Sequence, residues 1–115
     1  ICDAVFGALG EGDIGQLFPN TDPRWHNAPS KTFLHEAARL VHLRSGRIVN
    51  VDATIIAEAP KIAPHAHAMK AMISHVLEVH PNRISIKATT NEGMGFLGRG
   101  EGIAAMAVAS VDLPQ

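Results

Sequence analysis

Residues 48–57 carry the pattern that most restricts the fold of this chain. In this run Val49, Val51, Ala53 and Ile55 alternate with polar residues. Every second residue of a strand lies on the same face, and β-branched residues favour strands. The run therefore predicts a strand with one apolar face, which ends before the Ala59-Pro60 pair.

A helical period follows this break. Residues 64–80 begin with a proline, which suits the first position of a helix. Their apolar residues recur at positions i, i+3, i+4, i+7 and i+8, namely Met69, Met72, Ile73, Val76 and Leu77. This spacing predicts a helix whose apolar stripe, both methionines included, lies in the core.

Four further segments complete the expected architecture. Residues 1–9 and 31–45 have apolar residues at helical spacing, and Ser30 can cap the second of these helices. Residues 83–89 and 103–111 are typical of strands, and the last has apolar residues on both faces, as in a buried strand. We predict one α+β domain over residues 1–115, with two layers: a small mixed β-sheet and helices packed on one face.

Composition limits the classes of partner. The formal net charge of -1 provides no broad basic or acidic surface, so we expect neither a nucleic-acid partner nor a membrane surface. No apolar run approaches the roughly 20 residues that span a bilayer. The single cysteine, Cys2, cannot form an internal disulfide, which favours a reducing compartment. Small molecules and other copies of this chain are the expected partners.

The long loop at residues 12–30 contains two carboxylates. Asp13 and Asp22 could accept hydrogen bonds from a polyol ligand. Short acidic side chains also bond to nearby backbone groups in turns and helix caps. The sequence leaves both interpretations of this loop open.

Two other loops contain groups that suit a phosphate ligand. At residues 57–63 a strand leads into a helix, where backbone N–H groups and Lys61 could hold an anion. A solvated lysine is the alternative. At residues 87–92 two threonine hydroxyls lie beside Glu92, and these groups could bind phosphate and a hard cation. A structural Ser/Thr turn is the alternative there.

The seven histidines form no compact metal-binding motif. His65 and His67 are two residues apart, so on a helix they would point about 200° apart and could not chelate together. His35 and His42 are two helical turns apart. We predict surface positions for the first pair.

Four segments follow one another in an order that identifies a family. They are Asp3-Ala4 with residues 12–15, then residues 17–23, then residues 50–61 with Pro64-His65, and last residues 87–92 with Gly95-Phe96 and residues 98–102. Each segment alone would be weak evidence for membership of a family. Together they cover nearly the whole chain, and they resemble the 2-C-methyl-D-erythritol 2,4-cyclodiphosphate synthase family.

The resemblance implies a metal-dependent enzyme of the non-mevalonate isoprenoid pathway, a phosphorus-oxygen lyase. Its substrate would be 4-diphosphocytidyl-2-C-methyl-D-erythritol 2-phosphate, whose 2-phosphate attacks the β-phosphorus and releases CMP. Such chemistry depends on positioning and charge neutralisation. The resemblance also implies a homotrimer with active sites between subunits, in a bacterial cytoplasm or a plastid stroma.

The resemblance gives each loop a role. Thr90 would be catalytic, by stabilising the transition state, and Glu92 would bind a divalent cation, Mg²⁺ or Mn²⁺. The implied substrate-binding residues are Asp13, Ile14, Gly15, Phe18, Pro19, Asn20, Thr21, Asp22, Phe96 and Arg99. The implied nucleotide-binding residues are Ala57, Glu58, Ala59, Pro60, Lys61, Ile62, Ala63, Thr89, Thr90, Asn91 and Glu92.

The chain also departs from the family pattern. The family's Zn²⁺ ligands, and a His-Ser pair that orients the substrate, would lie upstream of Ile1. Because the apolar helical repeat begins at Ile1 itself, we expect an N-terminally incomplete domain; a fused upstream cytidylyltransferase domain stays an open question. Asn20 replaces a common Asp, and Gly93 and Met94 replace a usual Lys-Leu pair.

Two other functions compete with the enzyme interpretation. One is a non-catalytic, trimeric nucleotide-binding relative that lacks the zinc site. The other is a purely structural trimer, which would leave the loop at residues 89–92 unexplained.

Overall fold

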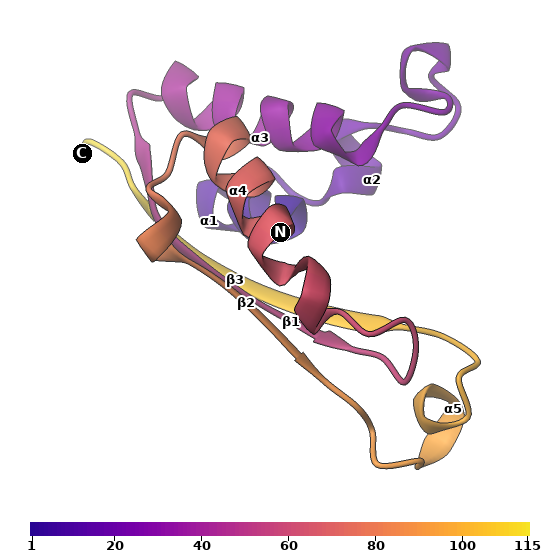
Figure 1. The fold of residues 1–115 in the computed structure, drawn as a ribbon. Coiled ribbons are helices and arrows are strands. Elements are labelled where there is room, and N and C mark those ends of the chain that lie inside the picture. The colour runs from indigo at the N-terminus through magenta and orange to yellow at the C-terminus, as the bar shows by residue number, and fades with distance from the viewer.

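The computed structural model describes all 115 residues, Ile1–Gln115. Helices cover one face of a twisted sheet, and one end of the sheet extends beyond them (Figure 1). None of the helices combines the length and apolar character that crossing a membrane requires. The elements in chain order are α1 (Cys2–Leu9), α2 (Ile14–Leu17), η1 (Pro23–Trp25), α3 (Ser30–Leu43), β1 (Arg47–Ile56), η2 (Ala63–His65), α4 (Ala66–Leu77), η3 (Pro81–Arg83), β2 (Ile84–Thr89), α5 (Gly95–Gly98) and β3 (Ala104–Asp112).

The sheet has three strands in the order β2-β1-β3. Strand β1 runs parallel to β2, with Ala53 opposite Ile86, and antiparallel to β3, with Ala53 opposite Ala107. Parallel neighbours need a crossover connection, and α4 provides it. The prediction of a small mixed sheet with helices on one face is confirmed.

A bulge near the start of β1 changes which residues face the helices. The pairing of β1 with β3 shifts register between Ile48 and Asn50. The extra residue lets Ile48 and Val51 both enter the core, although they are three positions apart. Val49 is only half-buried and lies outside the core cluster. The predicted alternation therefore holds from Asn50 onward, and the placement of Val49 on the buried face was wrong.

The core lies between the helices and the covered face of the sheet. Its fully buried side chains include Phe6 of α1, Val41 of α3, Val51 of β1, Leu77 of α4 and Ile84 of β2. Helix α3 packs on α4, and α1 packs on β3. Burial of these side chains contributes about 1.5–3 kcal/mol each, so contacts between distant segments hold the two layers together.

Three further sequence predictions need correction. Ser30 does not cap α3: Pro29 occupies the cap position in an extended conformation, and Ser30 is already helical. Met72 is 43% exposed because the buried arc of α4 is limited to Ile73, Val76 and Leu77. Residues 103–111 were expected to be buried on both faces.

In the structure β3 is an edge strand, and its outer face carries exposed apolar side chains. Val108 is 69% exposed and Met106 is 64% exposed. They lie opposite Asp52 and Thr54 of β1, on the face of the sheet that the helices leave uncovered. One chain alone therefore leaves an apolar surface on its sheet.

Candidate functional site

Two of the predicted loops meet at the carboxyl ends of β1 and β2. Because these strands are parallel, Ile56 lies opposite Thr89, and the amide of Ala57 donates to the carbonyl oxygen of Thr89 over 3.0 Å. An open pocket of about 500 Å³ lies at this junction. Its lining residues are Ala57, Glu58, Pro60, Lys61, Ile62, Ala63, Ala88, Thr89 and Thr90. All but Ala88 belong to the predicted nucleotide-binding set.

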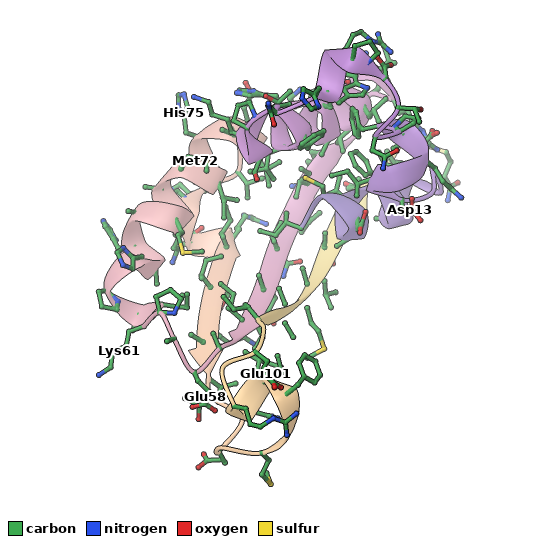
Figure 2. All side chains as sticks on the ribbon, turned by 90° about the vertical axis from the view of Figure 1, so that its right-hand side faces the viewer. Asp13, Glu58, Lys61, Met72, His75 and Glu101 are labelled. Carbon is green, nitrogen blue, oxygen red and sulfur yellow. The ribbon has the colours of Figure 1, made fainter.

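Lys61 provides the positive charge of this pocket. Its side chain is exposed and extends away from the ribbon just before η2 and α4, at the same end of the molecule as Glu58 (Figure 2). The amide groups at a helix start carry partial positive charge, and they follow Lys61 directly in the chain. This end of the pocket therefore suits an anionic ligand.

Residues 90–93 form an ordered turn beside the pocket. The amide of Glu92 donates to Oγ1 of Thr90 over 3.3 Å. This bond uses the hydroxyl oxygen as an acceptor, and its proton stays available for donation to a ligand oxygen. The turn that the sequence offered as an alternative is thus present, and it is compatible with binding a phosphate group.

The backbone of this turn has an uncommon conformation. Glu92 has φ of 56° and Gly93 has φ of 73°, both in the left-handed region. Two hydrogen bonds from the turn reach Glu58: the amides of Asn91 and Gly93 donate to its Oε1 over 3.0 and 3.3 Å. The side chain of Asn91 donates to the carbonyl oxygen of Met94 over 2.8 Å.

The residues of this chain fit one kind of metal site and not another. No group of three or more His, Cys, Asp or Glu side chains in this chain is placed to hold a metal ion, as a structural zinc site would require. Glu92 is exposed beside the pocket and offers carboxylate oxygens. Mg²⁺ and Mn²⁺ accept such oxygens together with water and phosphate oxygens, and Glu92 fits that role.

The first predicted loop is shaped by its own carboxylates. Asp13 caps α2 by accepting a hydrogen bond from the amide of Gln16 over 2.9 Å. Asp22 caps η1 and also accepts from the guanidinium of Arg24 over 2.8 Å. The side-chain hydrogen bonds from Arg24 hold the pKa of Asp22 below its ordinary value. Both carboxylates therefore serve as caps.

An aromatic cluster anchors the same loop. The ring of Phe18 is buried, and its centroid lies 5.9 Å from that of Phe6, 4.7 Å from that of Trp25 and 5.0 Å from that of Phe33. The side chain of Phe18 thus holds the loop against α1 and α3. Any ligand contact at this position would come from the backbone.

The first loop and the pocket lie at opposite ends of the folded molecule. In Figure 2, Asp13 is beside α2 at one end, while Glu58 and Lys61 are at the other end. The molecule is 46 Å along its longest axis. Phe96, which is 57% exposed, and Arg99, which pairs with Glu101 over 2.9 Å, lie at the pocket end with α5. One chain brings the predicted nucleotide residues together, and it keeps residues 13–22 apart from them.

Another hollow, of about 450 Å³, lies between α4 and the sheet. Met69, Ile73 and Ile86 are among the residues that line it, and every lining residue is hydrophobic. Without a polar side chain this hollow lacks the groups that orient a nucleotide.

Comparison with known proteins agrees with this geometry. The sequence model of the YgbB family matches residues 1–112. The chain belongs to the YgbB family. The resemblance seen in the four sequence segments is thereby confirmed.

Its relatives in the YgbB family include bifunctional enzymes. The chain is 56% identical over 115 residues to the bifunctional enzyme IspD/IspF of Paramagnetospirillum magneticum, covering 100% of this chain and 30% of that protein. The bifunctional IspDF from Campylobacter jejuni has a similar structure, with a TM-score of 0.91 and 38% identity over 97% of this chain and 30% of that one. The chain thus spans about 30% of the length of these relatives.

A shorter family member has been solved with a nucleotide. This structure of 2C-methyl-D-erythritol-2,4-cyclodiphosphate synthase, in a form with bound CDP, has a TM-score of 0.87 and 36% identity. The match covers 96% of this chain and 71% of that one.

Three features of the site were not predicted from the sequence. Ala88 lines the pocket, Glu58 bonds to the 90–93 turn, and Asp3 of α1 accepts a hydrogen bond from the amide of Ile14 over 2.7 Å. For Ala88, its place just before Thr89 on β2 was an available signal. The other two contacts join segments 11 and 33 residues apart, and no local pattern indicates them.

Proposed function

We propose that this domain converts 4-diphosphocytidyl-2-C-methyl-D-erythritol 2-phosphate into the 2,4-cyclodiphosphate and CMP, in the non-mevalonate isoprenoid pathway. The observation that carries the proposal is the meeting of Lys61, Thr90 and the Glu92 turn at one pocket, at the ends of two parallel strands. The CDP-bound relative supports a cytidine diphosphate group as the occupant.

The reaction is an internal displacement. An oxygen of the 2-phosphate forms a bond to the β-phosphorus, and the bond from that phosphorus to the oxygen it shares with the α-phosphorus breaks. That oxygen leaves with CMP. No covalent intermediate on the protein is required, so the residues act by holding the two phosphates in line and by balancing their charge.

Each pocket residue has a proposed part in this step. The ammonium group of Lys61 and the backbone amides of Lys61, Ile62 and Ala63 bind the diphosphate. The hydroxyl of Thr90 donates to a phosphoryl oxygen on which charge increases in the transition state. A divalent cation bound by Glu92 would supply positive charge between the phosphates.

The first loop is proposed to bind the methylerythritol phosphate. Oδ1 of Asp13 is used by the cap of α2, and its other oxygen can accept from a ligand hydroxyl. Backbone groups of Ile14, Gly15 and residues 18–22 complete this part, while Phe96 and Arg99 are proposed to contact the substrate from the α5 end.

We further propose a homotrimer with active sites between subunits. Two observations support it: residues 13–22 lie far from the pocket within one chain, and the uncovered sheet face carries exposed Met106 and Val108. Oδ1 of Asp52, on β1, is buried without a hydrogen-bond partner, and a neighbouring subunit could supply a donor. A bacterial cytoplasm or plastid stroma stays the predicted compartment.

The second candidate is a nucleotide-binding relative without activity. It would share the pocket at the ends of β1 and β2 and hold a nucleotide there without turnover. A zinc ion in the active protein would take its ligands from outside this chain.

An assay of CMP release separates the two candidates. The full-length protein, incubated with substrate and Mg²⁺, should release CMP, and Glu92→Gln should require more added metal for the same rate. Binding of CMP without any turnover would favour the inactive relative.

A further inference from the structure

The carboxylate of Glu58 joins the two strand ends that form the pocket. Glu58 follows β1 and is half-buried. Its Oε1 accepts hydrogen bonds from the amides of Asn91 and Gly93, which are 33 and 35 residues further along the chain. These two amides flank Glu92, the proposed cation ligand.

We propose that Glu58 is a positioning residue, whose carboxylate holds the 90–93 turn in the conformation that presents Thr90 and Glu92 to the phosphates. The proposal rests on the proposed function for the identity of the ligand. Its structural part, the control of the turn by Glu58, can be measured without any ligand.

The turn needs an external support because its backbone conformation is unfavourable. Glu92 has a side chain and yet adopts φ of 56°, where L residues meet steric strain. The bonds within the turn, from Glu92 to Thr90 and from Asn91 to Met94, are local and cannot fix its place relative to β1. Glu58 links it to that strand, and hydrogen bonds to a carboxylate are stronger than those to neutral acceptors.

The same bonds explain how a carboxylate is tolerated beside an anion site. A free carboxylate at residue 58 would repel a diphosphate. Two donated N–H groups offset part of this charge and turn the carboxylate toward the backbone of residues 91–93. Any contact of residue 58 with a nucleotide would then come from its main chain, while its side chain acts through the turn.

Three variants distinguish the effect of side-chain length at residue 58 from the effect of its charge. Glu58→Gln keeps an acceptor oxygen at the same reach and removes the charge. Glu58→Asp keeps the charge and shortens the side chain by one methylene. Glu58→Ala removes the acceptor. Glu36→Ala is the control, since Glu36 pairs with Arg39 on an exposed face of α3, away from the pocket.

Hydrogen exchange of individual amides in the full-length protein gives the direct reading. In Glu58→Ala and Glu58→Asp, the amides of Asn91 and Gly93 should exchange about tenfold faster or more, the size expected for losing a bond to a charged group. Glu58→Gln, which keeps an acceptor oxygen without the charge, should exchange at a rate between those of Glu58→Ala and the wild type, and Glu36→Ala should stay near the wild-type rate. If the alanine variant does not fold, the aspartate variant provides the same comparison.

Activity provides the second reading. Glu58→Ala and Glu58→Asp should lower kcat and increase the Mg²⁺ needed for half-maximal rate, and Glu58→Gln should restore both in part. Unchanged exchange in the alanine and aspartate variants, or a glutamine variant as impaired as alanine, would overturn the proposal. A wild-type protein that neither binds CMP nor releases it would instead reject the proposed function, and the exchange rates would still decide the role of Glu58 in the turn.

Discussion

The amide of Ile14 donates a hydrogen bond to Oδ1 of Asp3 over 2.7 Å, and this bond ties the first turn of α1 to the start of α2. Asp13 caps the same short helix. The position of the proposed methylerythritol-binding loop therefore depends on a carboxylate that does not itself belong to the loop.

Asp3→Ala should loosen this loop. Loss of the bond should cost about 1 kcal/mol, because the site is exposed, and should raise KM more than it lowers kcat. Hydrogen exchange at Ile14 and steady-state kinetics measure the two effects. Arg39→Ala, which breaks an exposed ion pair on α3, is the control. Normal exchange at Ile14 would show that the bond does not hold the loop.

Local patterns were sufficient for most of the fold. The change from helical to alternating periodicity located the main helices and all three strands, because each element buries one face. The predictions for Val49 and Met72 failed for a shared reason. The spacing of apolar residues indicates neither a bulge in a strand nor how much of a helix surface is buried. The sequence pattern of an apolar strand such as β3 is also the same in two cases: its second face can pack against its own chain, or it can pack against another copy.

The loops of the site could be predicted from the sequence, whereas the hydrogen bonds that join them to distant segments could not. The three loops could be recognised from residue types at strand and helix ends, and the parallel pairing of β1 with β2 then brings two of them together. The bonds from Glu58 to the 90–93 turn and from Asp3 to Ile14 depend on tertiary packing. No local rule could have found them.

Lys61→Ala should weaken CMP binding by about tenfold while leaving stability unchanged, because an exposed lysine has little packing to lose and one charged contact with phosphate to provide. Calorimetry with CMP and a thermal melt of the full-length protein test both statements. Lys31→Ala removes the same charge from an exposed position on α3 and should change neither. Equal CMP affinity in the two variants would remove Lys61 from the site.

Thr90→Val should lower kcat by roughly 100-fold with a smaller change in KM, since the lost hydroxyl donates mainly in the transition state. The substitution is nearly isosteric, and thermal stability should fall only slightly because the Glu92 amide loses an exposed acceptor. Initial rates of CMP release across substrate concentrations separate kcat from KM. A near-normal kcat would assign Thr90 to the turn alone.

Val108→Asp should separate the proposed trimer into monomers. It places a charge on the exposed apolar face of β3, where the proposed assembly would bury it without a partner. Leu43→Asp is the matched control, because Leu43 is 70% exposed on α3, away from that face. Light scattering at micromolar concentration gives the mass. A monomeric wild-type protein, or a trimeric Val108→Asp variant, would contradict the assembly.

Phosphorus NMR of the full-length protein with its proposed substrate and Mg²⁺ tests the central claim most directly. The proposed function predicts that CMP and a cyclic diphosphate appear together in equal amounts, because a single displacement forms one ring and releases one nucleotide. CMP accompanied by an open-chain bisphosphate, with two separate phosphate monoesters, would mean that water is the nucleophile. Unchanged substrate under conditions where CMP binds would mean that the pocket holds a nucleotide without performing the reaction, and either result would contradict the account.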